Sequence, residues 1–207
     1  MKQRKRVPRA EREQQMMDAA VAVFARDGFH AAGMEEIAVR CGVSKPMLYL
    51  YFESKEGLFI ACIKRESERL ATRISEAVSG HEEPKDQLWN GLRAFLEFVD
   101  ANRGAWSVLY RRARYLGDPV STEVSHLREN MIGLVTSLLS HGEETEGTDI
   151  SVAAHTLVGA CESLSDWLID RPEISVDEIG DQFTAIMWPG LAHLFRADRE
   201  EAPRKAS

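Results

Sequence analysis

The sequence has few cysteines and no long apolar run. Its 207 residues include three cysteines, Cys41, Cys62 and Cys161, which are far apart and form no CxxC pair. This pattern argues against a disulfide framework and favours a reduced protein. No apolar run approaches the roughly 18–20 residues that cross a bilayer, and no apolar segment of a secretory signal follows the basic N-terminus, MKQRKRVPR. We therefore expect a cytoplasmic chain with no membrane partner.

The motifs of common catalytic and metal sites are also missing. The six histidines show no HExxH or paired-ligand spacing. Ser163, Asp166 and His155 lie within twelve residues, but no nucleophile elbow precedes the serine. We therefore expect no enzymatic activity, no metal and no cofactor, with an enzyme that depends on Ser163 as the competing class.

Negative charge exceeds positive charge over the whole chain but not at its start. The net charge is −7, yet residues 1–55 hold ten Lys and Arg against seven Asp and Glu, whereas residues 56–207 hold sixteen against twenty-six. A basic arm joined to an acidic body predicts an anionic partner for the arm. We expect Arg4, Arg6 and Arg9 to contact that partner, and a solvated tail is the alternative.

What is present is mostly amphipathic helix. In the first segment, Met17, Ala20, Val21 and Phe24 recur at helical spacing, and Gly28 follows where a helix-ending glycine belongs. The same reasoning predicts an all-α fold of about nine helices. Their approximate ranges are 9–27, 34–40, 45–51, 55–79, 84–101, 103–116, 119–140, 150–170 and 176–197.

The stretch SKPMLYLYFESK, residues 44–55, could be taken for a buried strand because five apolar or aromatic residues follow one another. Its ends decide against that interpretation. Ser44 is a good helix N-cap, and Pro46 falls in the first turn, where its missing N–H does no harm. As a helix, the stretch turns Leu48 and Phe52 inward and leaves the remaining side chains outward.

Residues 34–40 and 45–51, joined by the turn at Gly42, have the spacing of a helix-turn-helix, whose second helix enters the major groove of DNA. The outward side chains suit that role. Lys45 can donate to guanine, Pro46 can meet a thymine methyl group, and tyrosine hydroxyls can reach phosphate oxygens. Lys55, at the next helix start, can offer its ammonium and backbone N–H groups to a phosphate.

Residues 28–59, GFHAAGMEEIAVRCGVSKPMLYLYFESKEGLF, resemble the DNA-binding signature of TetR/AcrR-family transcriptional regulators. The shared pattern includes Gly28-Phe29, Gly42-Val43-Ser44, Tyr51-Phe52 and Ser54-Lys55-Glu56. The resemblance implies a three-helix DNA-binding domain with its arm over residues 1–55, and a helical ligand-binding and dimerisation domain over residues 56–207.

The resemblance also implies which residues meet double-stranded DNA. Beside Arg4, Arg6 and Arg9, these are Gly33, Ser44, Lys45, Pro46, Met47, Tyr49, Leu50, Tyr51 and Lys55. Two positions depart from the family pattern. Ala32-Gly33 replaces a hydroxyl residue at the second helix start, which leaves backbone N–H contacts only, and Met47 replaces a residue that is commonly small or hydroxylated.

In this family a small-molecule pocket lies among the helices of the body. The implied ligand-binding residues are Trp89, Phe95, Phe98, Trp106, Tyr110, Arg114, Met131, Cys161 and Trp167. Pockets are mostly apolar with few polar groups, but each of these residues could equally belong to an ordinary core. Arg114, with Arg111 and Arg112, could receive an anionic ligand group or form a solvated helix face.

The last two helices carry small and apolar residues that could pair across a two-fold axis as a four-helix interface. The residues predicted at this interface are Ala153, Leu157, Ala160, Leu164, Phe183, Met187 and Leu191. The resulting hypothesis is a homodimeric repressor that binds a pseudo-palindromic operator and is released by a small, largely apolar effector. An activator, a ligand-independent regulator and a helical adaptor that binds protein are the alternatives.

Overall fold

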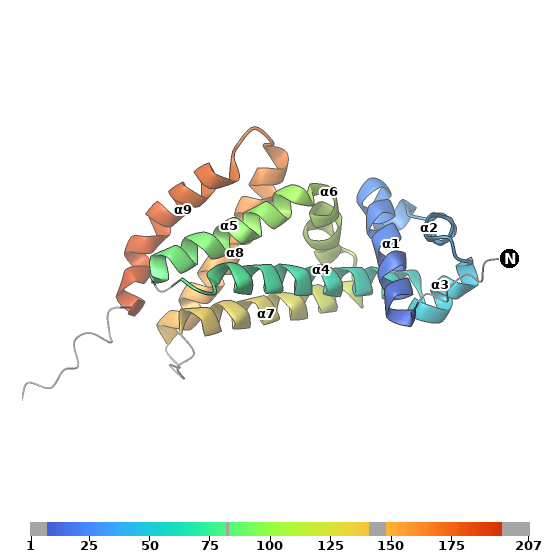
Figure 1. Cartoon of the computed structure of the whole chain (residues 1–207), viewed down its shortest axis with the longest axis horizontal. Helices are drawn as coiled ribbons and strands as arrows, with labels where there is room; N and C mark the ends of the chain where they lie inside the picture. Colours follow the sequence, from blue (N-terminus) through green and yellow to red (C-terminus); the bar gives the residue numbers. More distant parts are fainter. Residues whose placement is uncertain (1–7, 82, 141–147, 196–207) are drawn as a thin grey trace, which may run out of the picture. The chain divides into compact units, whose positions relative to one another are not determined.

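The structure, a computed structural model, describes residues 8–81, 83–140 and 148–195 (Figure 1). These residues form nine α-helices and no strand, which confirms the all-α prediction. The helices are α1 Arg9–Ala31, α2 Met34–Cys41, α3 Lys45–Phe52, α4 Lys55–Val78, α5 Pro84–Ala101, α6 Arg103–Trp106, α7 Val120–Leu139, α8 Thr148–Asp170 and α9 Val176–Leu191. No helix within the described ranges is long and apolar enough to cross a membrane.

The chain divides into two compact units. Unit 1 contains the described residues up to Glu68 together with Asn102–Leu127, and unit 2 contains Arg69–Ala101 and the described residues from Arg128 onward. The helices α4 and α7 therefore each contribute residues to both units. The boundary after residue 55, expected from the resemblance, stays a prediction.

The core of unit 1 holds α1, α2, α3 and the first turns of α4 together. Phe24 and Phe59 are fully buried, and their rings meet edge to face with centroids 4.9 Å apart. Leu48 of α3 and Ile37 of α2 are equally buried. Because burial of each such side chain stabilises the fold by about 1.5–3 kcal/mol, this core fixes how α3 is presented.

The connections around α3 follow the predicted end signals. Ser54 caps α4, since its hydroxyl oxygen accepts a hydrogen bond from the backbone N–H of Gly57 at 2.9 Å. Gly57 is itself required, because a Cβ there would lie 2.1 Å from the carbonyl oxygen of Phe52. Gly28, with φ +76°, interrupts the helical backbone of α1 close to the predicted end at residue 27.

Two helices end at other residues than the sequence predicted. Residues 103–116 were expected as one α-helix, but after α6 the chain forms a π-helical segment, Ser107–Arg112, and then a 3-10 turn, Ala113–Tyr115. The buried residues Val108 and Ala113 are five positions apart, a spacing that the wider π-helical turn places on one face. At the other end, α9 stops at Leu191, two residues after Pro189, and continues as a 3-10 turn to Phe195.

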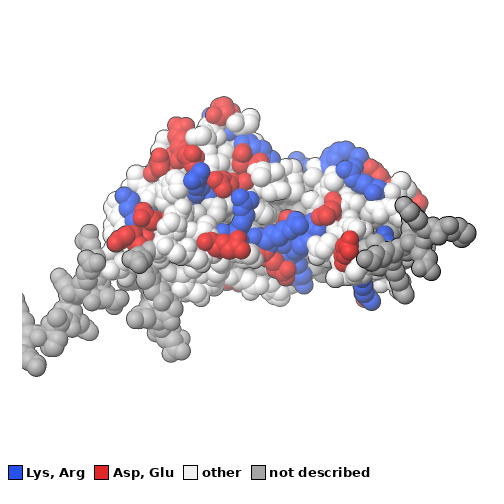
Figure 2. All heavy atoms as spheres, viewed as in Figure 1, with Lys and Arg blue, Asp and Glu red and all other residues white. Residues whose placement is uncertain are grey.

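In unit 2, α5 packs against both α8 and α9 (Figure 1). The indole N–H of Trp89 donates to the carboxylate of Asp181 at 2.9 Å, and its ring lies beside Gly180. Ile132 of α7 packs with Ala154 and Val158 of α8. The outer side of α9 is acidic: Figure 2 shows negatively charged side chains gathered over this helix, which exposes Asp177, Glu178 and Asp181.

Candidate nucleic-acid interface

The helix α3 has one buried and one exposed face. Leu48 and Phe52 lie in the core of unit 1, as the sequence predicted. On the outside, Leu50 is 76% exposed, Tyr49 41% and Met47 39%. Apolar side chains this exposed on a short helix are unusual for packing residues, so the face is available to a partner.

The start of α3 has the geometry of a helix N-terminus. Ser44 occupies the N-cap position with an extended backbone, φ −81° and ψ 149°, and Pro46 lies in the first turn, both as predicted. The Ser44 side chain makes no capping hydrogen bond, whereas its carbonyl oxygen accepts from the backbone N–H of Met47 at 2.9 Å. The hydroxyl of Ser44 is therefore not needed to hold the helix.

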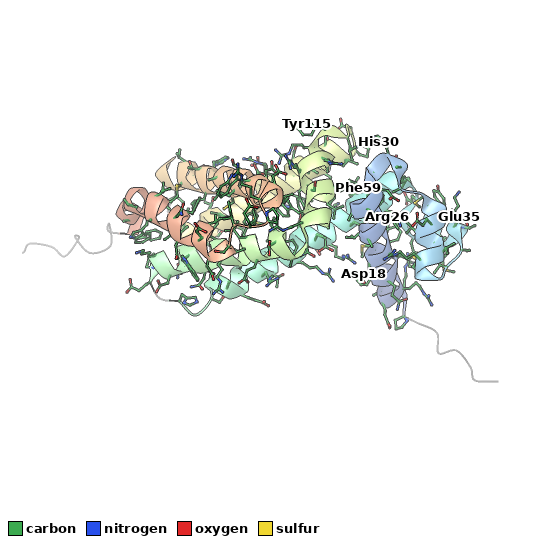
Figure 3. All side chains as sticks on the ribbon, turned by 90° about the horizontal axis from the view of Figure 1, so that it is seen from above. Asp18, Arg26, His30, Glu35, Phe59 and Tyr115 are labelled. Atoms are coloured by element: carbon green, nitrogen blue, oxygen red, sulfur yellow. The ribbon has the colours of Figure 1, made fainter. Side chains whose placement is uncertain are left out.

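Acidic side chains lie close to this helix start, a feature that the sequence reasoning missed. The carboxylate of Glu35, in the first turn of α2, lies 3.9 Å from the ammonium of Lys45 (Glu35 is marked in Figure 3). Glu36 accepts a hydrogen bond at 2.6 Å from Arg26 of α1. Gly33 is the N-cap residue of α2 and has an extended backbone. Glu35 and Glu36, in the first turn of α2, therefore lie at the helix end where we expected a phosphate contact.

Tyr51 and Arg9, two of the predicted DNA contacts, are brought together. Tyr51 is half-buried against the core, and the Arg9 guanidinium lies 5.1 Å from its ring centroid. A cation over an aromatic face at this distance is attractive, so the start of α1 is held to α3. Arg4 and Arg6 fall outside the described residues.

Lys55 is directed into unit 1. Its ammonium donates to the backbone carbonyl of His30 at 3.0 Å and lies 4.9 Å from the ring centroid of Phe29. Burial lowers the pKa of this ammonium. The side chain therefore fixes the end of α1 against the start of α4.

A charged cluster joins α1 to α4 behind this interface. The Arg65 guanidinium donates to Glu66 at 2.7 and 2.9 Å and to the carboxylate of Asp18 at 2.8 Å (Asp18 is marked in Figure 3). It also reaches Gln14, both the backbone and the side-chain oxygen, at 3.3 Å. Arg65 and Glu66 are buried, whereas the Asp18 side chain is 62% exposed. The buried charges are thus paired, as burial demands.

The predicted ligand residues of unit 1 include one close pair. The rings of Trp106 and Tyr110 stack with centroids 4.2 Å apart, and the Tyr110 hydroxyl shares a 3.0 Å hydrogen bond with that of Ser67. Burial raises the pKa of Tyr110. Arg114 is exposed on the 3-10 turn that follows.

The remaining predicted ligand residues lie in unit 2. Phe95 and Phe98 are buried on α5, and Trp89 is at the contact between α5 and α9. Met131 packs beside the α7–α8 cluster, and burial raises the pKa of the Cys161 thiol to about 12. Trp167 is exposed, with the Arg171 guanidinium 5.8 Å from its ring centroid.

The predicted dimer residues lie mostly inside unit 2. Ala153, Leu157, Phe183 and Leu191 are buried in the single chain, and Ala160, Leu164 and Met187 are partly buried. The large apolar side chains that α8 and α9 expose are Val152, Trp167 and Ile186. The periodic apolar pattern identifies the buried side of α8 and α9. Large apolar residues outside that pattern are the signal that could have identified the exposed side chains.

Among the described residues, no group of three or more His, Cys, Asp or Glu side chains could hold a metal ion. The three cysteines are free thiols.

Two family models match the chain. Residues 16–62 match the model of bacterial regulatory proteins of the tetR family, and residues 84–190 match the tetracyclin repressor-like C-terminal domain. The first covers α2 and α3, and the second covers α5 to most of α9. Both helical parts that the sequence predicted are therefore matched.

Individual relatives agree with these models. The chain is 30% identical over 190 residues to the HTH-type transcriptional activator FasR of Mycolicibacterium smegmatis. The aligned region covers 91% of this chain and 87% of FasR. It is 21% identical over 182 residues to the fatty acid metabolism regulator protein of Bacillus subtilis, covering 86% and 94%. These relatives are transcription regulators and not enzymes, as predicted.

Solved structures match the fold. A TetR-like transcriptional regulator from a Rhodococcus species is 42% identical, with a TM-score of 0.71 over 90% of this chain and 99% of that one. The regulator FadR from Bacillus subtilis, solved in complex with stearoyl-CoA, is 21% identical, with a TM-score of 0.73 over 84% and 96%. The second likeness concerns the fold alone.

Proposed function

Because the chain belongs to the TetR family of bacterial regulatory proteins, we propose that it is a homodimeric repressor that binds a pseudo-palindromic operator and is released by an apolar effector. The observation that carries this proposal is the exposed face of α3, where Met47, Tyr49 and Leu50 point away from a core closed by Leu48 and Phe52. A helix of this kind enters the major groove.

On the operator, the first turn of α3 meets the base edges. Lys45 donates to guanine and Pro46 touches a thymine methyl group, while Tyr49 and Tyr51 donate their hydroxyls to phosphate oxygens. Ser44 and Gly33 offer backbone N–H groups to the phosphates that flank the groove. Arg9 and the arm before it add contacts that are independent of sequence.

Dimerisation places two copies of α3 on two half-sites. The outward faces of α8 and α9, with Val152 and Ile186, form the contact between copies. Half-sites in such operators lie about 34–36 Å apart. A charged side chain in place of Ile186 should raise the dimer dissociation constant in analytical ultracentrifugation, whereas the same change at the exposed Tyr115 should not.

The effector is a long-chain fatty acyl thioester. One relative is named for fatty acid metabolism, and FadR of the same fold was solved with stearoyl-CoA. Unit 2 has buried apolar side chains on α5, Phe95, Leu96 and Phe98, and an acyl chain needs a lining of that kind. Stearoyl-CoA should release the labelled operator in an anisotropy titration, and coenzyme A alone should not.

Activation is a second candidate. The relative that is 30% identical over most of this chain is named a transcriptional activator. Transcription in vitro from a promoter that carries the operator distinguishes repression from activation. A repressor lowers transcript yield until the effector is added, and an activator raises it.

DNA binding itself is tested by selection. The full chain is incubated with random DNA, bound DNA is sequenced, and affinities are measured with the recovered site. Lys45→Ala combined with Tyr49→Phe should lower affinity at least tenfold, whereas Tyr115→Phe, which removes an exposed hydroxyl from the 3-10 turn after the π-helical segment, should leave it unchanged. No enrichment of any sequence by the native protein would overturn the proposal.

A further inference from the structure

The recognition helix carries few groups that can hydrogen-bond to a base. The residues of α3 are KPMLYLYF, so the helix contains no Arg, Asn, Gln, Ser, Thr, Asp or Glu. These are the residue types that supply most specific base contacts. Only Lys45 and the two tyrosines have polar side-chain atoms on this helix.

Two of these three polar groups, Lys45 and Tyr51, are also constrained. The Lys45 ammonium lies 3.9 Å from Glu35, which competes with any acceptor on a base. Tyr51 is half-buried, and the Arg9 guanidinium covers its ring. Hydrogen bonds from α3 can therefore supply little of the sequence preference.

The outward surface of α3 is instead apolar. Leu50 is 76% exposed and Met47 39% exposed. They are three positions apart, so their side chains are neighbours on one helix face. Leu48 and Phe52, the other apolar residues of the helix besides Pro46, are buried on the opposite side.

The major groove offers one apolar group for such a surface, the C5-methyl group of thymine. We propose that Met47 and Leu50 are the main specificity-determining residues and that they select thymine methyl groups in each half-site. The proposal rests on the DNA-binding function proposed above. It assigns sequence preference to apolar contact rather than to hydrogen bonding.

Deoxyuridine tests this assignment because it removes the methyl group of thymine and keeps both the base pairing and the O4 acceptor. The full chain is used to select its site from random DNA. Each thymine of that site is then replaced by deoxyuridine, and affinities are measured by fluorescence anisotropy. Loss of one buried methyl group should lower affinity by about threefold to fourfold.

The variants Leu50→Ala and Met47→Ala identify the reading residue. Each should bind the native site more weakly and lose its sensitivity to deoxyuridine at the thymine that it contacts. Tyr49→Phe is the matched control on the same helix. It should weaken binding to the thymine and deoxyuridine sites by the same factor, because a phosphate contact does not sense the methyl group.

The outcomes separate this inference from the function on which it rests. Sequence-specific binding that ignores deoxyuridine at every position would overturn the methyl readout and leave the regulator intact. Sensitivity that persists unchanged in both alanine variants would assign the methyl contact to another residue and also overturn it. Unaltered DNA binding by Leu50→Ala and Met47→Ala would indicate that the face serves a protein partner. Absence of any selected site would overturn the DNA-binding function itself.

Discussion

The ammonium of Lys55 donates a hydrogen bond to the backbone carbonyl of His30 at 3.0 Å and lies over the ring of Phe29. It was expected from the sequence as a phosphate contact. Its partners are instead the last turns of α1, so Lys55 stabilises unit 1 in the absence of DNA.

Lys55→Met should therefore lower the free energy of unfolding without DNA by about 1–2 kcal/mol, near the low end of the roughly 1.5–3 kcal/mol of a hydrogen bond to a charged group, because this bond is exposed. Urea unfolding followed by circular dichroism measures the change. Lys64→Met is the control, since Lys64 is on the same helix and is paired only at the surface with Glu123, which is worth less than about 1 kcal/mol. Equal effects of the two changes would contradict the structural role of Lys55.

The Arg65 cluster predicts unequal effects of its two ends. Arg65→Met removes the guanidinium that pairs with the buried Glu66, and breaking a buried pair costs about 3–5 kcal/mol. Asp18→Asn alters the exposed end of the same cluster and should cost less than about 1 kcal/mol. Chemical denaturation of both variants measures the difference. Similar losses of stability in the two variants would show that the buried pair contributes no more than the exposed one.

Glu35 places a negative charge beside Lys45. Since DNA is anionic, Glu35→Gln should tighten operator binding by about twofold to fivefold at low salt, and the gain should shrink as salt screens surface charges. Anisotropy titrations at two salt concentrations measure this. In a Lys45→Ala background the gain should be smaller, because part of it comes from freeing Lys45. An identical gain in both backgrounds would refute the coupling of the two side chains.

The carboxylate of Asp118 makes the stability of the protein depend on pH. The hydroxyls of Thr122 and Ser121 donate to its carboxylate at 2.6 and 2.7 Å and lower its pKa. A lowered pKa in the folded state adds stability above the unfolded value, about 3.9, and this contribution is lost as the pH falls through the lower folded value. The melting temperature of the native protein should exceed that of Asp118→Asn at pH 6, and the gap should narrow below about pH 4. A gap that is constant with pH would contradict this account.

The sequence predicted the fold well where local signals were strong. Pro46 and the N-cap position at Ser44 marked α3 as a helix, and the spacing of Leu48 and Phe52 identified its inner face. The expected start of the next helix at residue 55 agrees with α4, which Ser54 caps. These features depend on neighbouring residues, so one sequence is enough to predict them.

Contacts between distant residues could not be predicted in the same way. The bond from Lys55 to His30 and the approach of Glu35 to Lys45 depend on how α1, α2 and α4 pack. The same limit applies to Phe183 and Leu191, which are apolar and were assigned to a dimer interface but are buried within unit 2. Periodicity marks an apolar face, and it does not identify what covers that face.

The proposed DNA binding depends most directly on α3 as the element that reads the sequence. The decisive measurement is the affinity of the full chain for its selected site, compared with a scrambled site, for the native protein and for Lys45→Ala/Tyr49→Phe/Leu50→Ala. We predict that the native protein prefers its site by at least a hundredfold and that the triple variant binds both DNAs with the same weak, salt-dependent affinity. A triple variant that keeps the native preference would contradict the account.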